Sequence, residues 1–296
     1  MGIAFILLSA FSFALETVLL THFFRKHNSF LTIGLRGMGI MAAGLLVLPF
    51  VDFQKLLNLQ DYIFPLVFAA FFAVIGNWGY VRSTRHFPVG IANALVTAVQ
   101  VAVMIALGWI FAGERLSLIQ FLAIGGIVAS NSFIYSQKYF SEFVFHPGKI
   151  KGLFLVMVNG LFMSFAFFIL AFSAREYDPL ISGYIWECLI GIMALMIAIP
   201  SAFRSNRKGN VLSLERGDVI SILIRSFPAL LGTLFYAKAV TLLPLAITQA
   251  IFTSLVLFTA VLGRILYKEK LTNTQWLALV FVILMIAALK LYSQPS

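Results

Sequence analysis

Three charged side chains inside long apolar stretches are the residues of this sequence most able to do chemistry. Glu16 follows Ser9 and Ser12 within FILLSAFSFALETVLL, on one face of a predicted helix. Arg36 and Glu187 each stand 13 residues before a proline, in two other apolar stretches. Because removing a charge from water is costly unless the charge is paired, we expect each of the three to face a cavity or a partner.

Each of these charges admits a functional and a structural interpretation. Burial of Glu16 would favour its protonated form, and the residue would then carry protons or contact a substrate. Alternatively, Glu16 forms an ion pair with Arg36 and stays ionised. Arg36 could clamp a substrate carboxylate while Glu187 receives an ammonium group, or these two could form a buried pair that holds the fold together.

A stripe of polar residues supplies a second candidate surface. Asn93, Thr97 and Gln100 are spaced by four and three residues, which places them on one face of a helix. Gln249 and Thr253 form a similar stripe later in the chain. Such a stripe either lines a water-accessible cavity or forms hydrogen bonds between helices, which contribute only about 0.6 kcal/mol on average. We expect a cavity, because two stripes occur at matched positions.

Aromatic and amide side chains near these stretches are candidate walls of a binding site. Their rings suit planar or cationic organic solutes through stacking and cation–π contact, although each could equally serve packing. The candidates are Asn77, Trp78, Tyr80, Tyr184, Trp186 and Tyr236.

Several other chemistries lack their residues in this sequence. The four histidines fall at predicted helix ends without the spacing of a metal site, and the single cysteine, Cys188, excludes an internal disulfide. No phosphate-cradling loop or nucleophile motif occurs. We therefore predict no catalytic residue, no metal and no cofactor, and any uphill transport would have to use an ion gradient or exchange.

The elements that position these residues are predicted to be membrane-spanning helices. The sequence is 61% hydrophobic and 11% charged, against about 45–50% and about 25% in an ordinary soluble domain. Its apolar runs reach the length of about 20 residues that a bilayer requires, and they are too uniform for barrel strands. We predict an all-α polytopic membrane protein with ten transmembrane helices, over residues 3–23, 30–51, 62–82, 88–112, 116–137, 151–173, 179–203, 217–239, 244–267 and 272–292.

The positive charges predict how the chain is oriented. The net charge is +10, but Lys and Arg occur singly or in small groups at the ends of apolar runs, which makes no face for nucleic acid. They concentrate after the first, third, fifth, seventh and ninth helices, so the positive-inside rule places both termini outside the cytoplasm. We expect a bacterial-type inner membrane, a retained first helix rather than a signal peptide, and a monomer, with a dimer as the alternative.

The sequence also contains an internal duplication. GNWGYVRSTRHFPVGIANALVT and GTLFYAKAVTLLPLAITQAIFT align so that Gly76, Tyr80, Pro88 and Thr97 match Gly232, Tyr236, Pro244 and Thr253. Because five helices per half is an odd number, the second half must enter the membrane from the opposite side, which predicts two inverted five-helix repeats around a midplane site. We assign residues 1–137 and 151–296 to the repeats and 138–150 to a cytoplasmic linker.

With this arrangement, the sequence resembles the drug/metabolite transporter superfamily, specifically its EamA-type members. In each half a proline opens the fourth helix and a glutamate closes it, Glu114 in AGERLSLIQ and Glu269 in YKEKLTNTQ. The resemblance implies a transporter of metabolites or drugs. The first helix also resembles that of the small multidrug resistance proteins, which implies for Glu16 the position that binds protons and cationic drugs in exchange.

Together these observations predict a secondary active transporter that exports small organic metabolites or drugs by alternating access. Protons are the candidate coupling ion, and Glu16 is their candidate carrier. Glu114 and Glu269 are expected to cap helix junctions on opposite membrane faces and to act as gate latches. The alternative is a membrane-embedded enzyme or an accessory subunit without transport activity.

Overall fold

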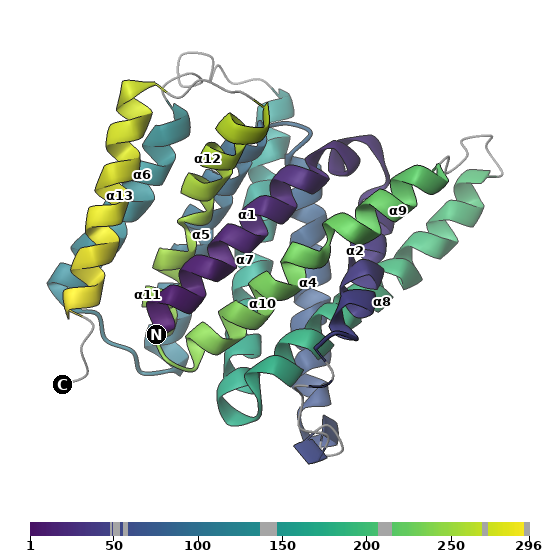
Figure 1. The fold of residues 1–296 in the computed structure, drawn as a ribbon, viewed down its shortest axis with the longest axis horizontal. Coiled ribbons are helices and arrows are strands. Elements are labelled where there is room, and N and C mark those ends of the chain that lie inside the picture. The colour runs from purple at the N-terminus through teal and green to yellow at the C-terminus, as the bar shows by residue number, and fades with distance from the viewer. Residues whose placement is uncertain are drawn as a thin grey trace.

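The protein is a bundle of helices (Figure 1). A computed structural model describes residues 1–47, 49, 54–55, 59–136, 147–206, 215–267 and 272–292, and all regular structure within these ranges is helical. The helices of the first half are α1 (Gly2–Lys26), α2 (Ser29–Gly44), the short η2 (Leu59–Asp61), α4 (Ile63–Ser83), α5 (Val89–Phe111) and α6 (Leu118–Ser136). Those of the second half are α7 (Pro147–Glu176), α8 (Pro179–Asn206), α9 (Arg216–Arg225), α10 (Phe227–Val240), α11 (Leu245–Phe252), α12 (Leu255–Tyr267) and α13 (Asn273–Tyr292).

Helix length and composition identify a multi-pass membrane protein. Within the described residues, seven helical segments are long and apolar enough to cross a bilayer, and two of these are formed by α9 with α10 and by α11 with α12. The apolar parts of α2, α6 and α13 are shorter. Large apolar side chains such as Trp109, Leu122 and Leu277 lie exposed on the outer surface, where lipid would cover them.

Most of the predicted helices are present, with ends that differ by a few residues, but three predictions need correction. The predicted helix 30–51 ends at Gly44, because the N–H groups of the next three residues bond to carbonyls three residues back and form turns. Residues 48, 50 and 51 lie outside the described residues. The predicted helix 217–239 is interrupted at Ser226, because Pro228 lies in the first turn of α10 and has no N–H to continue the ladder.

The predicted helix 244–267 is also interrupted, between α11 and α12, although neither proline nor glycine occurs there. The side-chain amide of Asn131 on α6 donates to the carbonyl oxygen of Thr253 at 3.1 Å and to its hydroxyl oxygen at 2.9 Å. A side chain that inserts into the backbone ladder opens it. By contrast, α5, which is the equivalent of this segment in the first half, is continuous.

The first helix of each half packs against a helix of the other half. Helix α1 of the first half lies along α10 of the second, and α7 of the second half lies along α4 of the first (Figure 1). Matching bonds hold these pairs, because Ser9 Oγ donates to the Gly232 carbonyl and Asn159 Nδ2 donates to the Gly76 carbonyl, both at 2.7 Å. The glycines are the pair that the sequence duplication aligns.

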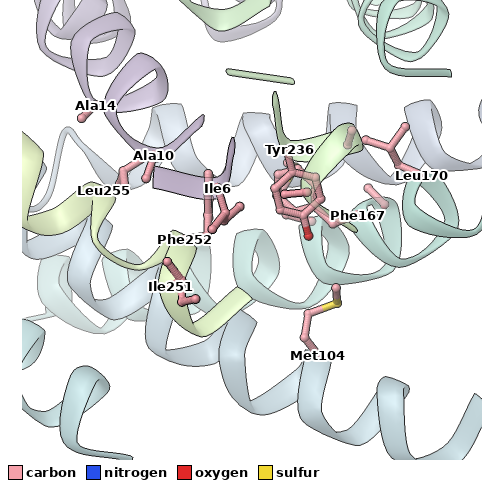
Figure 2. Close-up of a cluster of buried hydrophobic side chains, with 14 of the residues drawn as sticks. Ile6, Ala10, Ala14, Met104, Phe167, Leu170, Tyr236, Ile251, Phe252 and Leu255 are labelled. Atoms are coloured by element: carbon pink, nitrogen blue, oxygen red, sulfur yellow. The ribbon is translucent and has the colours of Figure 1, made fainter. Parts of the chain in front are cut away.

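Aromatic side chains such as Phe167, Tyr236 and Phe252 form part of the buried core of the bundle (Figure 2). The ring of Phe167 on α7 lies 4.5 Å from that of Tyr236 on α10 and 5.9 Å from that of Phe252 on α11. Phe13 of α1 meets the edge of Phe252 at 5.6 Å. We call Phe13, Phe167, Tyr236 and Phe252 the aromatic cluster. It joins four helices from both halves, and three of its members, Phe13, Phe167 and Phe252, line the cavity described next.

Candidate functional site

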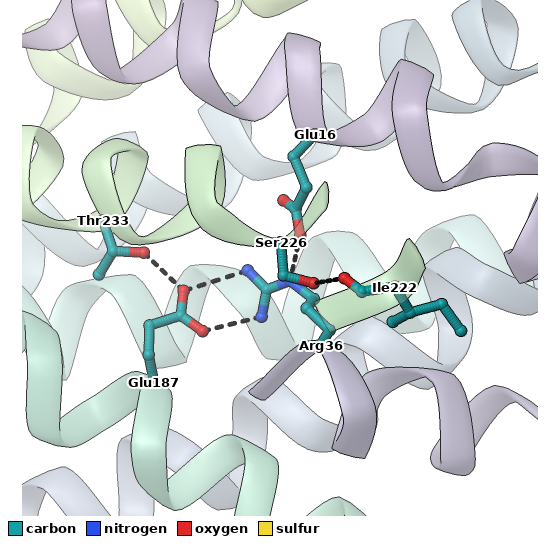
Figure 3. Close-up of polar contacts among 6 residues, drawn as sticks. All are labelled: Glu16, Arg36, Glu187, Ile222, Ser226 and Thr233. Carbon is teal, nitrogen blue, oxygen red and sulfur yellow. Dashed lines mark hydrogen bonds and ion pairs between the residues drawn. The ribbon is translucent and has the colours of Figure 1, made fainter. Parts of the chain in front are cut away.

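The three charges that the sequence places in apolar helices meet in one ion cluster (Figure 3). Arg36 on α2 binds both carboxylates: its Nε donates to Oε1 of Glu16 on α1. Its Nη1 and Nη2 donate to Oε2 and Oε1 of Glu187 on α8, at 2.8 and 3.1 Å. The hydroxyl of Thr233 on α10 also donates to Glu187 Oε1, at 2.5 Å. Both of the structural ion pairs considered from the sequence are therefore present, and Arg36 belongs to both.

The ion cluster is almost completely removed from the surface. Glu16, Arg36 and Glu187 expose 5%, 7% and 1% of their area. With both carboxylates ionised, the guanidinium neutralises only one of them, and the cluster carries one net negative charge. Of the two, Glu187 is more fully bound, since both of its oxygens accept hydrogen bonds while Glu16 accepts through Oε1 alone among the described contacts. A single proton on the cluster would make it neutral.

Close helix packing brings Arg36 and Glu187 together. Gly37 follows Arg36, and Gly191 lies one turn after Glu187. A Cβ atom built on Gly191 would lie 2.7 Å from the Gly37 Cα, so the two backbones touch at this crossing. Small residues permit such contact between membrane helices. The two-pronged contact between guanidinium and carboxylate therefore depends on glycines next to the charges.

A central cavity of about 100 Å³ adjoins the ion cluster. Helices of both halves line it, and its wall includes the ion cluster, the aromatic residues Phe13, Phe167, Trp186 and Phe252, and a group of polar residues. The polar residues are Thr17, Asn77, Tyr80, Asn93, Thr97, Gln100 and Asn159. Ligand pockets commonly have volumes of roughly 300–1,000 Å³, so this conformation has room for a small solute or part of a larger one.

The central cavity lies toward one face of the bundle. We call this the Arg25 face, because α1 and α4 end there and Arg25 Nε donates to the carbonyl of Thr84 at 3.0 Å. Lining residues such as Phe24, Val81 and Asn93 lie near these helix ends. The aromatic cluster lies on the other side of the cavity. The opposite, Glu114 face is where α5 and α10 end and α11 begins.

Nine of the fourteen side chains predicted to form the site line this one cavity. They are Glu16, Arg36, Asn77, Tyr80, Asn93, Thr97, Gln100, Trp186 and Glu187. Apart from the ion cluster, Tyr80 and Asn93 are bonded to each other, because the Tyr80 hydroxyl donates to Asn93 Oδ1 at 2.6 Å. The structure thus gathers charged, amide, hydroxyl and aromatic groups around one space, and a role for each in binding stays a prediction.

The other five predicted side chains lie away from the cavity wall. Trp78 stacks on Phe30 and receives Arg82 over its ring, and the Tyr184 hydroxyl donates to the carbonyl of Met41. Thr253 accepts the amide of Asn131. Tyr236 and Gln249 are fully buried and bonded to each other at 3.2 Å.

Asn159 and Met163 on α7 line the central cavity and were not predicted from the sequence. Asn159 Oδ1 accepts a hydrogen bond from Gln100 Nε2 at 3.4 Å, and Gln100 Oε1 accepts from Gln249 Nε2 at 3.0 Å. Asn159 therefore joins a hydrogen-bonded chain that runs from Tyr236 through Gln249 and Gln100. Its signal in the sequence is one amide within the apolar run of residues 153–163.

Glu114 connects two other helices at the Glu114 face. Its carboxylate accepts the backbone N–H groups of Leu245 and Ala246 at 2.7 and 3.3 Å, at the N-terminus of α11. Arg175 at the end of α7 contacts the same carboxylate at 3.5 Å and donates to the carbonyl of Leu243. We call this set the Glu114 clamp. Glu269, its predicted counterpart on the other face, lies outside the described residues.

Replacing Glu114 with alanine is expected to lower the free energy of unfolding by about 1–2 kcal/mol, because two N–H groups at a helix start lose their acceptor. Thermal unfolding in detergent measures the change. Glu114→Gln keeps one acceptor oxygen and should recover part of the loss. If both variants unfold like the wild type, the clamp does not stabilise this conformation.

A buried ion cluster beside a cavity, enclosed by two packed sets of membrane helices, is the arrangement of a membrane transporter. The sequence model of the EamA-like transporter family matches the chain twice, over residues 1–136 and 150–290. The chain belongs to this family, and its class is that of membrane transporters of small solutes.

Comparison with solved structures gives the same fold. A structure titled only "Crystal structure of protein" is similar over 99% of this chain and 95% of its own, with a TM-score of 0.73 and 12% sequence identity. At this identity the similarity concerns the fold alone. The search of curated proteins finds no match.

Proposed function

We propose that this protein is a secondary active transporter that exports a small organic solute across the cell membrane by alternating access. In this proposal α9 with α10 and α11 with α12 each form one span, and α2, α6 and α13 complete a set of ten. The spans form two inverted five-helix repeats with both termini outside the cytoplasm, and the protein works as a monomer.

The observation that carries the proposal is the ion cluster at the boundary between the halves. Glu16 and Arg36 belong to the first half and Glu187 to the second, and all three line the central cavity. A charge inside a membrane protein normally faces a partner or a solute pathway, and these three charges are paired and also line a cavity. A cluster shared by two halves senses their relative movement, because Arg36 and Glu187 cannot separate without breaking two hydrogen bonds.

Proton coupling follows from the charge of the ion cluster. One net negative charge in an apolar site is costly, and a proton or a cationic group removes it. Glu16 is the proposed proton carrier, since its second oxygen is not used in the described hydrogen bonds and it lines the cavity. The other titratable groups that line the cavity are Arg36, Glu187 and Tyr80.

The position of the cavity fits the loading step of the proposed export. The Arg25 face is the cytoplasmic face under the positive-inside rule, because Arg25, Lys26, Arg82 and Arg85 all lie at it. A cavity on that side is the conformation in which an exporter takes up its solute.

Glu16→Gln is expected to abolish transport driven by a pH gradient, because an amide cannot take up or release the proton. The protein would be reconstituted in liposomes, and solute exchange would be screened by counterflow against a broad metabolite panel, with and without a pH gradient. Glu215→Gln, at an exposed helix start, is the matched control and should transport like the wild type.

Two results would contradict this proposal at different levels. If Glu16→Gln responds to the pH gradient as the wild type does, Glu16 is not the proton carrier. If the wild type exchanges no solute of the panel, the chain does not act alone as a transporter of that class.

A further inference from the structure

The central cavity is asymmetric although the chain is duplicated. Seven of its lining residues lie on α4 and α5: Asn77, Tyr80, Val81, Asn93, Val96, Thr97 and Gln100. The duplication pairs them with Thr233, Tyr236, Ala237, Gln249, Phe252, Thr253 and Val256, which lie on α10, α11 and α12 except for Thr253 between the last two. Of these counterparts only Phe252 lines the cavity, and the others expose 1% of their area or less.

The two copies nevertheless carry the same chemistry. Tyr80 donates to the amide oxygen of Asn93, and Tyr236, at the equivalent position, donates to the amide oxygen of Gln249. Both pairs are separated by 13 residues. The same phenol and amide are therefore positioned twice, once at the cavity wall and once in the packed interior.

Two features keep the second copy closed. The rings of Phe167 and Phe252 pack against Tyr236, and Gln249 is held behind the cavity wall by its hydrogen bond to Gln100. The Glu114 clamp fixes the start of α11 to α7. The backbones also differ, because α5 is continuous where α11 and α12 are separated at Thr253. The two copies of one sequence pattern thus hold two conformations.

We propose that Tyr236, Gln249 and Thr253 form a second half-site for the solute, which lines the pathway when the protein opens to the Glu114 face. This inference rests on the proposed alternating access between inverted repeats. In the opposite-facing conformation α10 and α11 separate, α4 and α5 close, and the phenol and amide of the second copy replace those of the first. The solute would contact a phenol and an amide in both conformations, so it could keep the same kinds of hydrogen bond throughout transport.

In each of the two conformations, the closed half is expected to make one specific hydrogen bond to the ion cluster. In the present conformation the closed second half contacts the cluster through the Thr233 hydroxyl, which donates to Glu187. The counterpart of Thr233 is Asn77, and the counterpart of Glu187 is Arg36. An amide oxygen is the acceptor that a guanidinium requires. When the first half closes, Asn77 is therefore expected to accept from Arg36 as Thr233 releases Glu187.

Cysteine labelling from each face of the membrane tests the half-site. In a Cys188→Ala background, Asn93→Cys and Gln249→Cys form a matched pair, and Thr97→Cys with Thr253→Cys forms a second, less disruptive pair. A charged, membrane-impermeant methanethiosulfonate would be applied to each face of oriented vesicles. We expect Asn93→Cys to react from the Arg25 face and Gln249→Cys from the Glu114 face. Ala69→Cys, at a fully buried position on α4, is the unreactive control.

Opening the Glu114 clamp should shift the labelling. Adding Glu114→Ala is expected to raise the rate at Gln249→Cys about tenfold and to lower it at Asn93→Cys, because losing a charged hydrogen bond moves the equilibrium by about that factor. If both second-copy cysteines stay unreactive from the Glu114 face, or react only from the Arg25 face, while counterflow continues, the half-site is wrong and transport stands. Wild-type protein that exchanges no solute would instead remove the proposed function on which the half-site rests.

Discussion

Arg36→Met is expected to lower the free energy of unfolding by about 3–5 kcal/mol, because it leaves two buried carboxylates without their cation. Glu16 and Glu187 lose the charged hydrogen bonds that hold them, and Thr233 alone cannot replace those of Glu187. Thermal unfolding of the purified protein in detergent measures the loss.

Neutral partners should restore stability to Arg36→Met. When Glu16→Gln and Glu187→Gln are added, no uncompensated charge remains, and we expect most of the lost stability to return while transport does not. Arg36→Lys should be intermediate, since an ammonium group cannot make the forked contact with Glu187 and reach Glu16 through a separate Nε. If Arg36→Met unfolds like the wild type, the carboxylates are protonated in the native state and the cluster is not held together by charge.

Gly37→Ala is expected to lower the free energy of unfolding by about 3 kcal/mol, which is at the upper end for an overpacked site. The added methyl group would meet the backbone of Gly191 rather than a movable side chain. The helices must separate to admit it, and Arg36 then moves away from Glu187. Stability in detergent and counterflow transport should both fall.

A second glycine provides the control for Gly37→Ala. A Cβ atom on Gly125 of α6 would have nothing within 4 Å, and Gly125→Ala should change stability little or raise it by up to about 1 kcal/mol. Equal unfolding temperatures for the two alanine variants would show that α2 and α8 can separate at no cost.

The helices could be predicted from the sequence because lipid imposes a length and a composition on them. Their interruptions followed different rules. Pro228 marks the break at Ser226 in the sequence itself, whereas the break at Thr253 arises from Asn131, which is 122 residues away in the chain. A cause that comes from another helix leaves no local signal.

The charges of the candidate site could be found from the sequence, but their arrangement could not. Glu16, Arg36 and Glu187 stand out because apolar helices rarely hold charges. Whether they pair depends on the crossing of α2 with α8, and the sequence left both interpretations open. Which aromatic residues line the cavity depends on the rotation of each helix about its axis. On α4 this rotation places Tyr80 on the cavity wall and Trp78, two residues earlier, against Phe30.

The packing of α1 against a helix of the second half has a consequence for how the protein folds during its synthesis. Ser9 of α1 bonds to Gly232, 223 residues further along, so the surface that receives α1 is synthesised long after α1 has entered the membrane. The first half cannot complete its packing alone and must wait in lipid. Arg36 follows Glu16 by only 20 residues, so the ion pair between α1 and α2 can form as soon as both are inserted. The charge that later serves the site can thus first protect a lone carboxylate from lipid during synthesis.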